Sequence, residues 1–123
     1  MNQITVIGNV GKDPELKYTQ GGKAVVKFTM ADTRGKDDQK ETIWHNVVCF
    51  DEMAENVAEQ VRKGTRVLVQ GRFSERKYQD KDGQDRTWQE VVADEVSLSL
   101  RWGKKDQTSA IAKTFNAIEE DPF

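Results

Sequence analysis

The feature that most constrains the fold of this chain is a period-two alternation of apolar and polar residues, which recurs along the first hundred residues. Alternation of this kind is typical of β-strands with one buried face. It predicts four strands, at residues 3–11, 23–31, 42–50 and 65–73. The last of these continues into a long hairpin, whose tip is marked by Asp82-Gly83 and whose return strand ends at Trp102.

One segment departs from the alternation. Residues 51–64 place apolar side chains three and four residues apart, which predicts an α-helix with Asp51 as its N-cap and Gly64 as its stop. The predicted order is three strands, this helix, a fourth strand and a hairpin that leads into a fifth. That order is typical of a five-stranded Greek-key barrel, the OB-fold. The predicted fold class is therefore all-β, with one helix between the third and fourth strands, a long hairpin and a disordered C-terminal tail.

The segments between the strands are expected to be loops, at 12–22 and 31–41. The strand at 42–50 is ambiguous, because Trp44 and Phe50 lie on one face and the other face is apolar too. We expect something to cover both faces of this strand. The pattern leaves open whether the two rings are core aromatics or exposed. The strand at 23–31, by contrast, has a clear core face formed by Ala24, Val26, Phe28 and Met30.

Length and composition bound the class of protein. A chain of 123 residues with one cysteine, Cys49, fits one domain with a tail and cannot form an internal disulfide. It contains no run of about 18 apolar residues to span a membrane, and its first residues lack the pattern of a secretory signal. We therefore expect a cytoplasmic protein. The net charge is −2, whereas nucleic-acid binders are often strongly basic, so any such function depends on where the charges lie.

Residue sets for catalysis or metal binding are missing from the sequence. The single histidine, His45, and Cys49 would lie about 13 Å apart along a strand, too far for a nucleophile–base pair. One histidine and one cysteine cannot supply a zinc site of the usual kind. The segment DKDGQD puts Tyr78 and Gln89 where a calcium loop requires its first and last carboxylates. The sequence predicts a protein without enzymatic activity, cofactor or metal.

Aromatic and basic residues are interleaved along the strands and the hairpin. Single-stranded nucleic acids need this mixture, since bases stack on exposed rings for about 1–3 kcal/mol each while cations follow the phosphates. The alternative for the hairpin is a solvated ribbon with ordinary cross-strand pairs. The rings are Trp44, Phe50, Tyr78 and Trp88, and the cations are Lys27, Arg72, Arg76, Lys77 and Arg86.

Three segments together carry a resemblance to a known family. They are IGNVGKDPELKYTQGGKAVVKFTMA, TIWHNVVCFDEMAENVAEQVRKG and RKYQDKDGQDRT. In this order they resemble the bacterial single-stranded DNA-binding proteins over nearly all of residues 1–102. The resemblance implies that residues 1–102 form an OB-fold domain for binding single-stranded DNA and for oligomerisation, usually as a homotetramer. It further implies a nucleoid-associated protein that coats and protects exposed strands with little sequence preference.

The resemblance also implies roles for individual residues. Trp44 and Phe50 match the family's stacking aromatics, and Tyr78 matches an aromatic on the hairpin. His45 matches a histidine at the subunit interface. The cations that the resemblance assigns to the DNA backbone are Lys17, Arg62, Lys63, Arg76, Lys77 and Arg86.

The sequence departs from the family pattern at several positions. The loop at 31–41 has no aromatic, although well-known members stack a tryptophan there. Asn46 and Glu52 stand where basic residues are frequent. Trp88 either replaces the missing platform or packs with the residues it alternates with, which are Val92, Val96 and Leu98.

The C-terminal residues resemble the acidic tip of the family. The tip consists of Glu119, Glu120, Asp121, Pro122 and Phe123. In the family it docks on replication, recombination and repair proteins, which predicts that the terminal ring enters a partner's pocket; the alternative is a frayed terminus without function. Residues 103–118 are expected to be a short flexible linker, in which Ile111, Phe115 and Ile118 form an apolar set suited to an amphipathic turn on binding.

Two other functions stay open from the sequence. An OB-fold with stacking aromatics also suits RNA, because stacking does not exclude the 2′-hydroxyl. A protein–protein adaptor that has lost DNA binding would keep the barrel and the tip. Competition between DNA and RNA strands, or a lack of binding to both, separates these functions.

Overall fold

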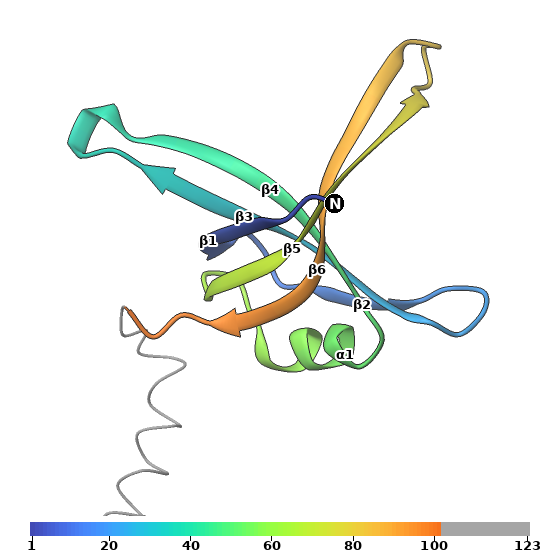
Figure 1. Cartoon of the computed structure of the whole chain (residues 1–123), viewed down its shortest axis with the longest axis horizontal. Coiled ribbons are helices and arrows are strands. Elements are labelled where there is room, and N and C mark those ends of the chain that lie inside the picture. Colours follow the sequence, from blue (N-terminus) through green and yellow to red (C-terminus); the bar gives the residue numbers. More distant parts are fainter. Residues whose placement is uncertain (102–123) are drawn as a thin grey trace, which may run out of the picture.

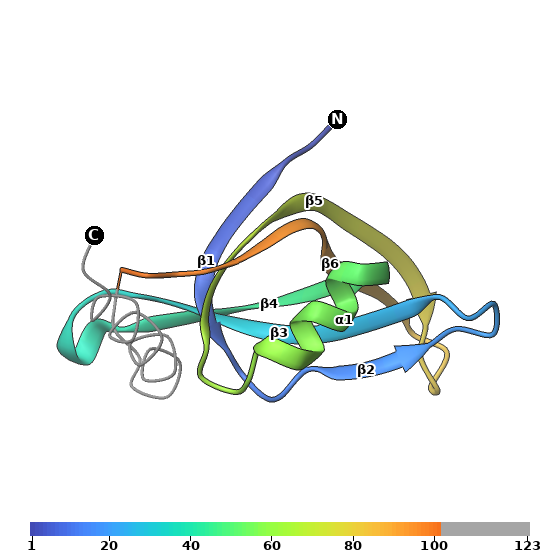
Figure 2. The ribbon, with the colours of Figure 1, turned by 90° about the horizontal axis from the view of Figure 1, so that it is seen from below.

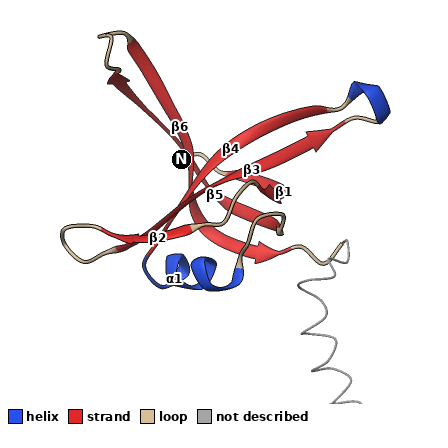
Figure 3. Cartoon of the chain, turned by 180° about the vertical axis from the view of Figure 1, so that it is seen from behind, coloured by secondary structure: helices blue, strands red, loops and turns tan. Residues whose placement is uncertain are grey.

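The computed structural model describes residues 1–101 of the chain. This part contains six strands, one α-helix and a 3-10 turn (Figures 1 and 3). The strands are β1 (Ile4–Val10), β2 (Glu15–Tyr18), β3 (Ala24–Arg34), β4 (Glu41–Phe50), β5 (Arg66–Gln79) and β6 (Asp85–Leu98). The helix is α1 (Asp51–Gln60), and the 3-10 turn is η1 (Asp37–Gln39).

The sheet closes on itself through the first strand. Its strands follow the order β1-β5-β6-β4-β3-β2, and a further pairing joins β1 to β3 at Asn9↔Ala31 and Val10↔Met30. Five strands thus form a ring, with α1 between β4 and β5, and β2 is added outside the ring on β3. The predicted OB-fold is confirmed. The hairpins β3–β4 and β5–β6 extend from the barrel in diverging directions (Figure 1).

The barrel interior is filled mainly by valines. The core face predicted for the strand at 23–31 is confirmed, since its four members are all buried. α1 lies across one end of the barrel (Figure 2) and adds Ala54 and Val57 to the core, and Val61 follows directly after the helix. On β4, Val47 and Cys49 belong to the core, whereas Trp44 is 59% exposed on the other face. Val48 also lies on that other face, but it is buried, because β6 runs alongside β4 there and pairs with it at Val48↔Val92.

Two segments expected to be loops contain strands. β2 lies within 12–22, pairs with β3 from Glu15↔Lys27 to Tyr18↔Ala24, and consists of four exposed residues. A strand this short with no buried side chain shows no alternation of apolar and polar residues, so the sequence pattern does not predict it. β3 and β4 also extend into the loop expected at 31–41, where their pairing continues to Arg34↔Glu41.

The helix is shorter than its apolar spacing predicts. It ends at Gln60, not at 63–64, and Arg62 donates hydrogen bonds to the carbonyl oxygens of Ala58 at 2.7 Å and Val61 at 2.9 Å. The side chain thus satisfies carbonyl groups that a helix end leaves unpaired. The expected N-cap is also wrong. Phe50 occupies that position without a side-chain hydrogen bond, and Asp51 is the first helical residue, with φ of 62°.

A β-bulge interrupts the pairing of β5 with β6. Gln70 pairs with Glu95 and the next residue, Gly71, pairs with Ala93, so Asp94 is left over on β6. The bulge reverses which residues of β6 face the core: Val91 and Ala93 do so before it and Val96 after it. The grouping of Trp88 with Val96 and Leu98, based on simple alternation, is therefore wrong.

The hairpin tip predicted at Asp82-Gly83 is confirmed. β5 and β6 pair up to Gln79↔Asp85, and Gly83 has φ of 77°, a left-handed conformation that suits glycine. Within residues 1–101, no helix has the length and hydropathy needed to cross a membrane.

Candidate nucleic-acid interface

Strand pairing brings side chains from five strands onto one continuous face of the sheet. Directly paired residues point to the same side of a sheet. Lys17 of β2 pairs with Val25 of β3, which pairs with Phe50 of β4. Val48 of β4 then pairs with Val92 of β6, and the rest of the hairpin continues the face. We call this surface the outward face; its members are Glu15, Lys17, Val25, Lys27, Thr29, Trp44, Asn46, Val48, Phe50, Arg72, Ser74, Arg76, Tyr78, Arg86, Trp88, Glu90 and Val92.

All four aromatic residues predicted to stack bases lie on the outward face. Trp44 is 59% exposed and Tyr78 is 46% exposed, while Phe50 and Trp88 are half-buried. Trp88 sits opposite Arg76 in the hairpin, and Tyr78 sits opposite Arg86. Each hairpin ring thus has a guanidinium as its direct cross-strand neighbour.

Trp88 lies at the centre of the candidate site. It lines three neighbouring hollows, one with Lys27, Arg76 and Tyr78, and another with Trp44, Tyr78 and Arg86. The indole Nε1 of Trp88 donates a 2.8 Å hydrogen bond to the carboxylate of Glu90, which fixes the orientation of the ring. All three hollows include Trp88, so they lie next to one another around this ring, and we call them together the track. The hollow with Trp44 also reaches His45 and Val91, which belong to the other side of the sheet.

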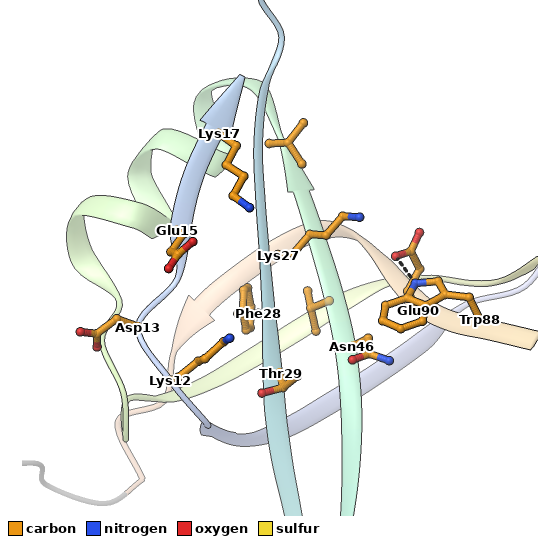
Figure 4. A pocket seen from close by; sticks show the side chains of 12 residues that line it. Lys12, Asp13, Glu15, Lys17, Lys27, Phe28, Thr29, Asn46, Trp88 and Glu90 are labelled. Carbon is orange, nitrogen blue, oxygen red and sulfur yellow. Dashed lines mark hydrogen bonds between the residues drawn. The ribbon is translucent and has the colours of Figure 1, made fainter. Parts of the chain in front are cut away.

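The third hollow carries a cluster of lysines. Lys12, Lys17 and Lys27 line it, with Trp88 at its rim (Figure 4). Three carboxylates also line it, those of Asp13, Glu15 and Glu90. The lysines come from the loop after β1, from β2 and from β3. Three ammonium groups beside an indole ring provide binding partners for phosphates and a base at one place.

Charge is segregated on the domain although the whole chain has a net charge of −2. The outward face carries five cations, Lys17, Lys27, Arg72, Arg76 and Arg86, against two carboxylates, Glu15 and Glu90. By contrast, carboxylates gather on α1 and beyond the bulge of β6, at Glu52, Glu55, Glu59, Asp94 and Glu95. The basic character that the composition conceals is therefore local.

The hairpin tip holds one of these cations in place. Arg86 Nε donates to Asp80 Oδ2 at 2.9 Å, and the other oxygen of this carboxylate accepts the backbone N–H groups of Asp82 and Gln84. These hydrogen bonds, first of all the one from Arg86, lower the pKa of Asp80. Arg86 is thus anchored next to Tyr78.

Several residues at the site escaped the sequence reasoning. Lys12 follows β1 in a stretch that carries no strand pattern. Lys23 places its ammonium 5.0 Å from the ring centroid of Phe50 and 3.8 Å from the carboxylate of Asp51. Gly11 lies against Trp44, since a Cβ at this glycine would be 2.8 Å from the indole ring. These positions depend on contacts between strands, which no local signal in the sequence reveals.

Other predicted residues lie off the outward face. Lys77 pairs with Thr87 and points to the opposite side from Arg76. The guanidinium of Arg62 is bound to helix carbonyls. The backbone N–H of Lys63 donates to the Asp13 carboxylate at 2.7 Å, which places this residue beside the loop that carries Lys12.

His45 also points away from the outward face. It pairs with the buried Met30, and its Nε2 lies 3.7 Å from a carboxylate oxygen of Asp32. The opposite orientation of Trp44 and His45 on β4 thus agrees with the sequence pattern. The acidic tip, from Glu119 to Phe123, and the linker at 103–118 lie outside the described residues.

One position that departs from the family pattern has a structural partner. Asn46 Nδ2 donates to the Gln89 carbonyl oxygen at 3.1 Å, which ties β4 to β6 where their pairing begins. Burial raises the pKa of Cys49 to about 12, so its thiol stays neutral at physiological pH. No group of three or more potential metal-binding side chains occurs in residues 1–101.

Comparisons with known proteins agree with this arrangement. The model of the single-strand binding protein family matches residues 1–99. The chain is 45% identical over 106 residues to the single-stranded DNA-binding protein of Paenarthrobacter aurescens, covering 80% of this chain and 62% of that protein. It is 42% identical over 118 residues to single-stranded DNA-binding protein 2 of Streptomyces coelicolor, covering 90% of this chain and 57% of that protein.

A third relative matches along the whole chain. The single-stranded DNA-binding protein of Clostridium tetani is 42% identical over 126 residues, covering 100% of this chain and 85% of that protein. The chain thus spans less than two thirds of the length of the first two relatives and most of the third. Since the family match extends over nearly the whole described domain, the chain belongs to the single-strand binding protein family.

Proposed function

We propose that the outward face binds single-stranded DNA without sequence preference, and that the protein coats and protects exposed strands. The observation that carries the proposal is the placement of all four predicted aromatics on one face, each beside a cation or in a hollow that a cation also lines. Bases stack on rings whatever their identity, and cations neutralise phosphates whatever the sequence. Such a surface binds strands without reading them.

The remaining parts of the proposed function concern assembly and partners. The protein assembles as a homo-oligomer, a tetramer by its family resemblance, with His45 at a subunit interface. Its acidic tip recruits replication, recombination and repair proteins by placing Phe123 in a partner's pocket. The resemblance of EEDPF to the family's tip supports this role. The protein acts in the cytoplasm on the nucleoid, as a binding protein and not as an enzyme.

A competition experiment tests the proposed function. Fluorescence anisotropy of a labelled poly(dT) strand is measured with the full chain, against unlabelled DNA, RNA and duplex competitors. We expect single-stranded DNA of any sequence to compete best, and log Kobs to fall with log salt at about −0.7 per phosphate neutralised. Stronger competition by RNA would favour an RNA-binding OB-fold, and no binding to either strand would favour the adaptor.

A further inference from the structure

A second surface of the domain lies between α1 and β6, and no member of the outward face lines it. We call it the α1–β6 groove. Its α1 side includes Glu52, Met53 and Gln60, and its β6 side includes Asp94, Glu95 and Leu98. On β6 the groove begins at the bulge, beyond which the alternate set of side chains of this strand faces the core.

The groove combines an apolar floor with acidic rims. Met53 and Val96 are partly buried and pack against the core, and Leu98 is still 37% exposed. Glu52, Asp94 and Glu95 supply three carboxylates, and no lysine or arginine is among the lining residues. A basic segment with apolar side chains on one side would complement this surface in both respects.

The chain carries such a segment directly after the domain. Residues 103–118, GKKDQTSAIAKTFNAI, contain three lysines and one aspartate. Their large apolar residues, Ile111, Phe115 and Ile118, are spaced four and three apart, which is the spacing of one face of a helix. The segment therefore has a positive charge that complements the acidic rims and an apolar stripe that matches the apolar floor of the groove.

The connection to the domain allows this segment to reach the groove. β6 ends at Leu98, which itself lines the groove, and 12 residues separate Leu98 from Ile111. An extended chain of that length spans up to about 40 Å, whereas the ten residues of α1 are about 15 Å long. The chain can thus fold back along the whole groove.

We propose that residues 111–118 dock in the α1–β6 groove of their own domain. Ile111, Phe115 and Ile118 cover the floor at Met53 and Leu98, and the lysines of 103–118 face Glu52, Asp94 and Glu95. The docked segment leaves only the five-residue tip free. The tip then extends from a fixed place beside α1, away from the outward face.

Paramagnetic NMR on the full chain without DNA tests the proposal, so its outcome is independent of DNA binding. Ser109→Cys introduces a labelling site, and the native Cys49 does not compete because it is buried and its pKa is raised to about 12. With a nitroxide at residue 109, we expect the amide signals of α1 and of 94–98 to lose more than half their intensity. The amides of Lys27 and Asn46 on the outward face keep theirs.

Matched variants identify the contacts. In the labelled chain, the double substitution of Ile111 and Phe115 by serine should restore the groove signals. Glu95→Lys should restore them as well, whereas Glu59→Lys makes the same charge change on α1 outside the groove lining and should not. Full intensity in the groove of the unaltered labelled chain would overturn the proposal, as would equal recovery with Glu59→Lys.

A mixing experiment distinguishes the other possible occupants. An unlabelled isotope-enriched chain and an excess of nitroxide-labelled chain of natural isotope abundance are mixed in denaturant and refolded together, so that both kinds of chain share the same oligomers. We expect the groove signals to lose far less intensity than they do when the isotope-enriched chain itself carries the nitroxide. Equal loss would assign the groove to the segment of a second copy and overturn docking within one chain.

Discussion

At the scale of single residues, the proposed function depends most on Trp44. Its ring is 59% exposed on the outward face, so Trp44→Ala removes a stacking platform and little packing. We expect binding of poly(dT) to weaken by about 1–3 kcal/mol, or about 5- to 140-fold. Because the covered part of the ring packs against Gly11, the free energy of unfolding should fall by about 1 kcal/mol or less.

A second exposed aromatic provides the control for this experiment. Tyr18 is 61% exposed but pairs with the buried Ala24, which puts it on the other side of the sheet. Tyr18→Ala should leave anisotropy titrations with labelled poly(dT) unchanged. Equal weakening by both substitutions would refute the assignment of DNA to the outward face.

Two adjacent cations test the same face by charge. Arg76 pairs with Trp88 on the outward face, and Lys77 pairs with Thr87 on the opposite side. Arg76→Ala should reduce the steepness of the log–log salt dependence by about 0.7, the loss of one phosphate contact. Lys77→Ala removes the same charge from the chain, and we expect a clearly smaller change. A larger effect from Lys77 would place the strand on the other side of the hairpin.

The buried thiol predicts a dependence of stability on pH. Burial raises the pKa of Cys49 from 9.0 to about 12, so between these values the unfolded chain loses a proton that the folded chain keeps. The contribution of the protonated thiol to the free energy of unfolding is fully present below pH 9. Above pH 9 it falls by about 1.4 kcal/mol per pH unit. Urea midpoints measured from about pH 8 to about pH 10.5 should fall more for the native chain than for Cys49→Ala. Parallel pH profiles of the two proteins would contradict this role of the thiol.

Single residues also show where sequence reasoning reached its limit. The core face of β3 follows from alternation alone, because one side of that strand is apolar and the other carries lysines. Trp44 could not be assigned in this way, since its face also contains Val48, which is buried under the pairing with β6. That contact joins residues more than 40 positions apart. The family resemblance predicted the role of Trp44, and the paired strands placed it on an exposed face.

At the scale of elements, the bulge at Asp94 decides which residues of β6 lie on the outward face and which face the core. Gly71 lies opposite this bulge, and a Cβ there would collide with the carbonyl oxygen of Val92. Gly71→Ala should therefore lower the free energy of unfolding by about 1–3 kcal/mol in urea denaturation. Gly21→Ala is the control, because that glycine lacks a positive φ and its nearest neighbour would be 3.9 Å away. Similar stabilities for the two variants would mean that the backbone at the bulge can shift to accommodate a Cβ at little cost in free energy.

The elements differ in how well the sequence predicts them. Long strands and the helix have enough periodic residues to be recognised, whereas β2 has four exposed residues and is held only by its pairing with β3. The helix end depends on hydrogen bonds from Arg62 to two carbonyls, which spacing does not encode. The bulge reverses the alternation within β6 without any glycine or proline on that strand. Each of these features arises from tertiary contacts.

At the scale of the whole molecule, function follows from the distribution of charge and not from its sum. The outward face is basic, α1 and the part of β6 beyond the bulge are acidic, and the net charge of −2 averages over both. A DNA strand should therefore be attracted to the outward face and repelled from the carboxylates of α1 and β6. Composition alone would have argued against nucleic acid.

The most direct test of this account is a titration of intrinsic tryptophan fluorescence with poly(dT), at low and at high salt. Trp44 and Trp88 both line the proposed track, so stacking of bases should quench their emission strongly. We predict quenching that saturates at a fixed ratio of nucleotides to protein and requires more DNA at high salt. Unchanged emission at concentrations where the labelled strand is fully bound would show that DNA lies elsewhere, and would contradict the central claim.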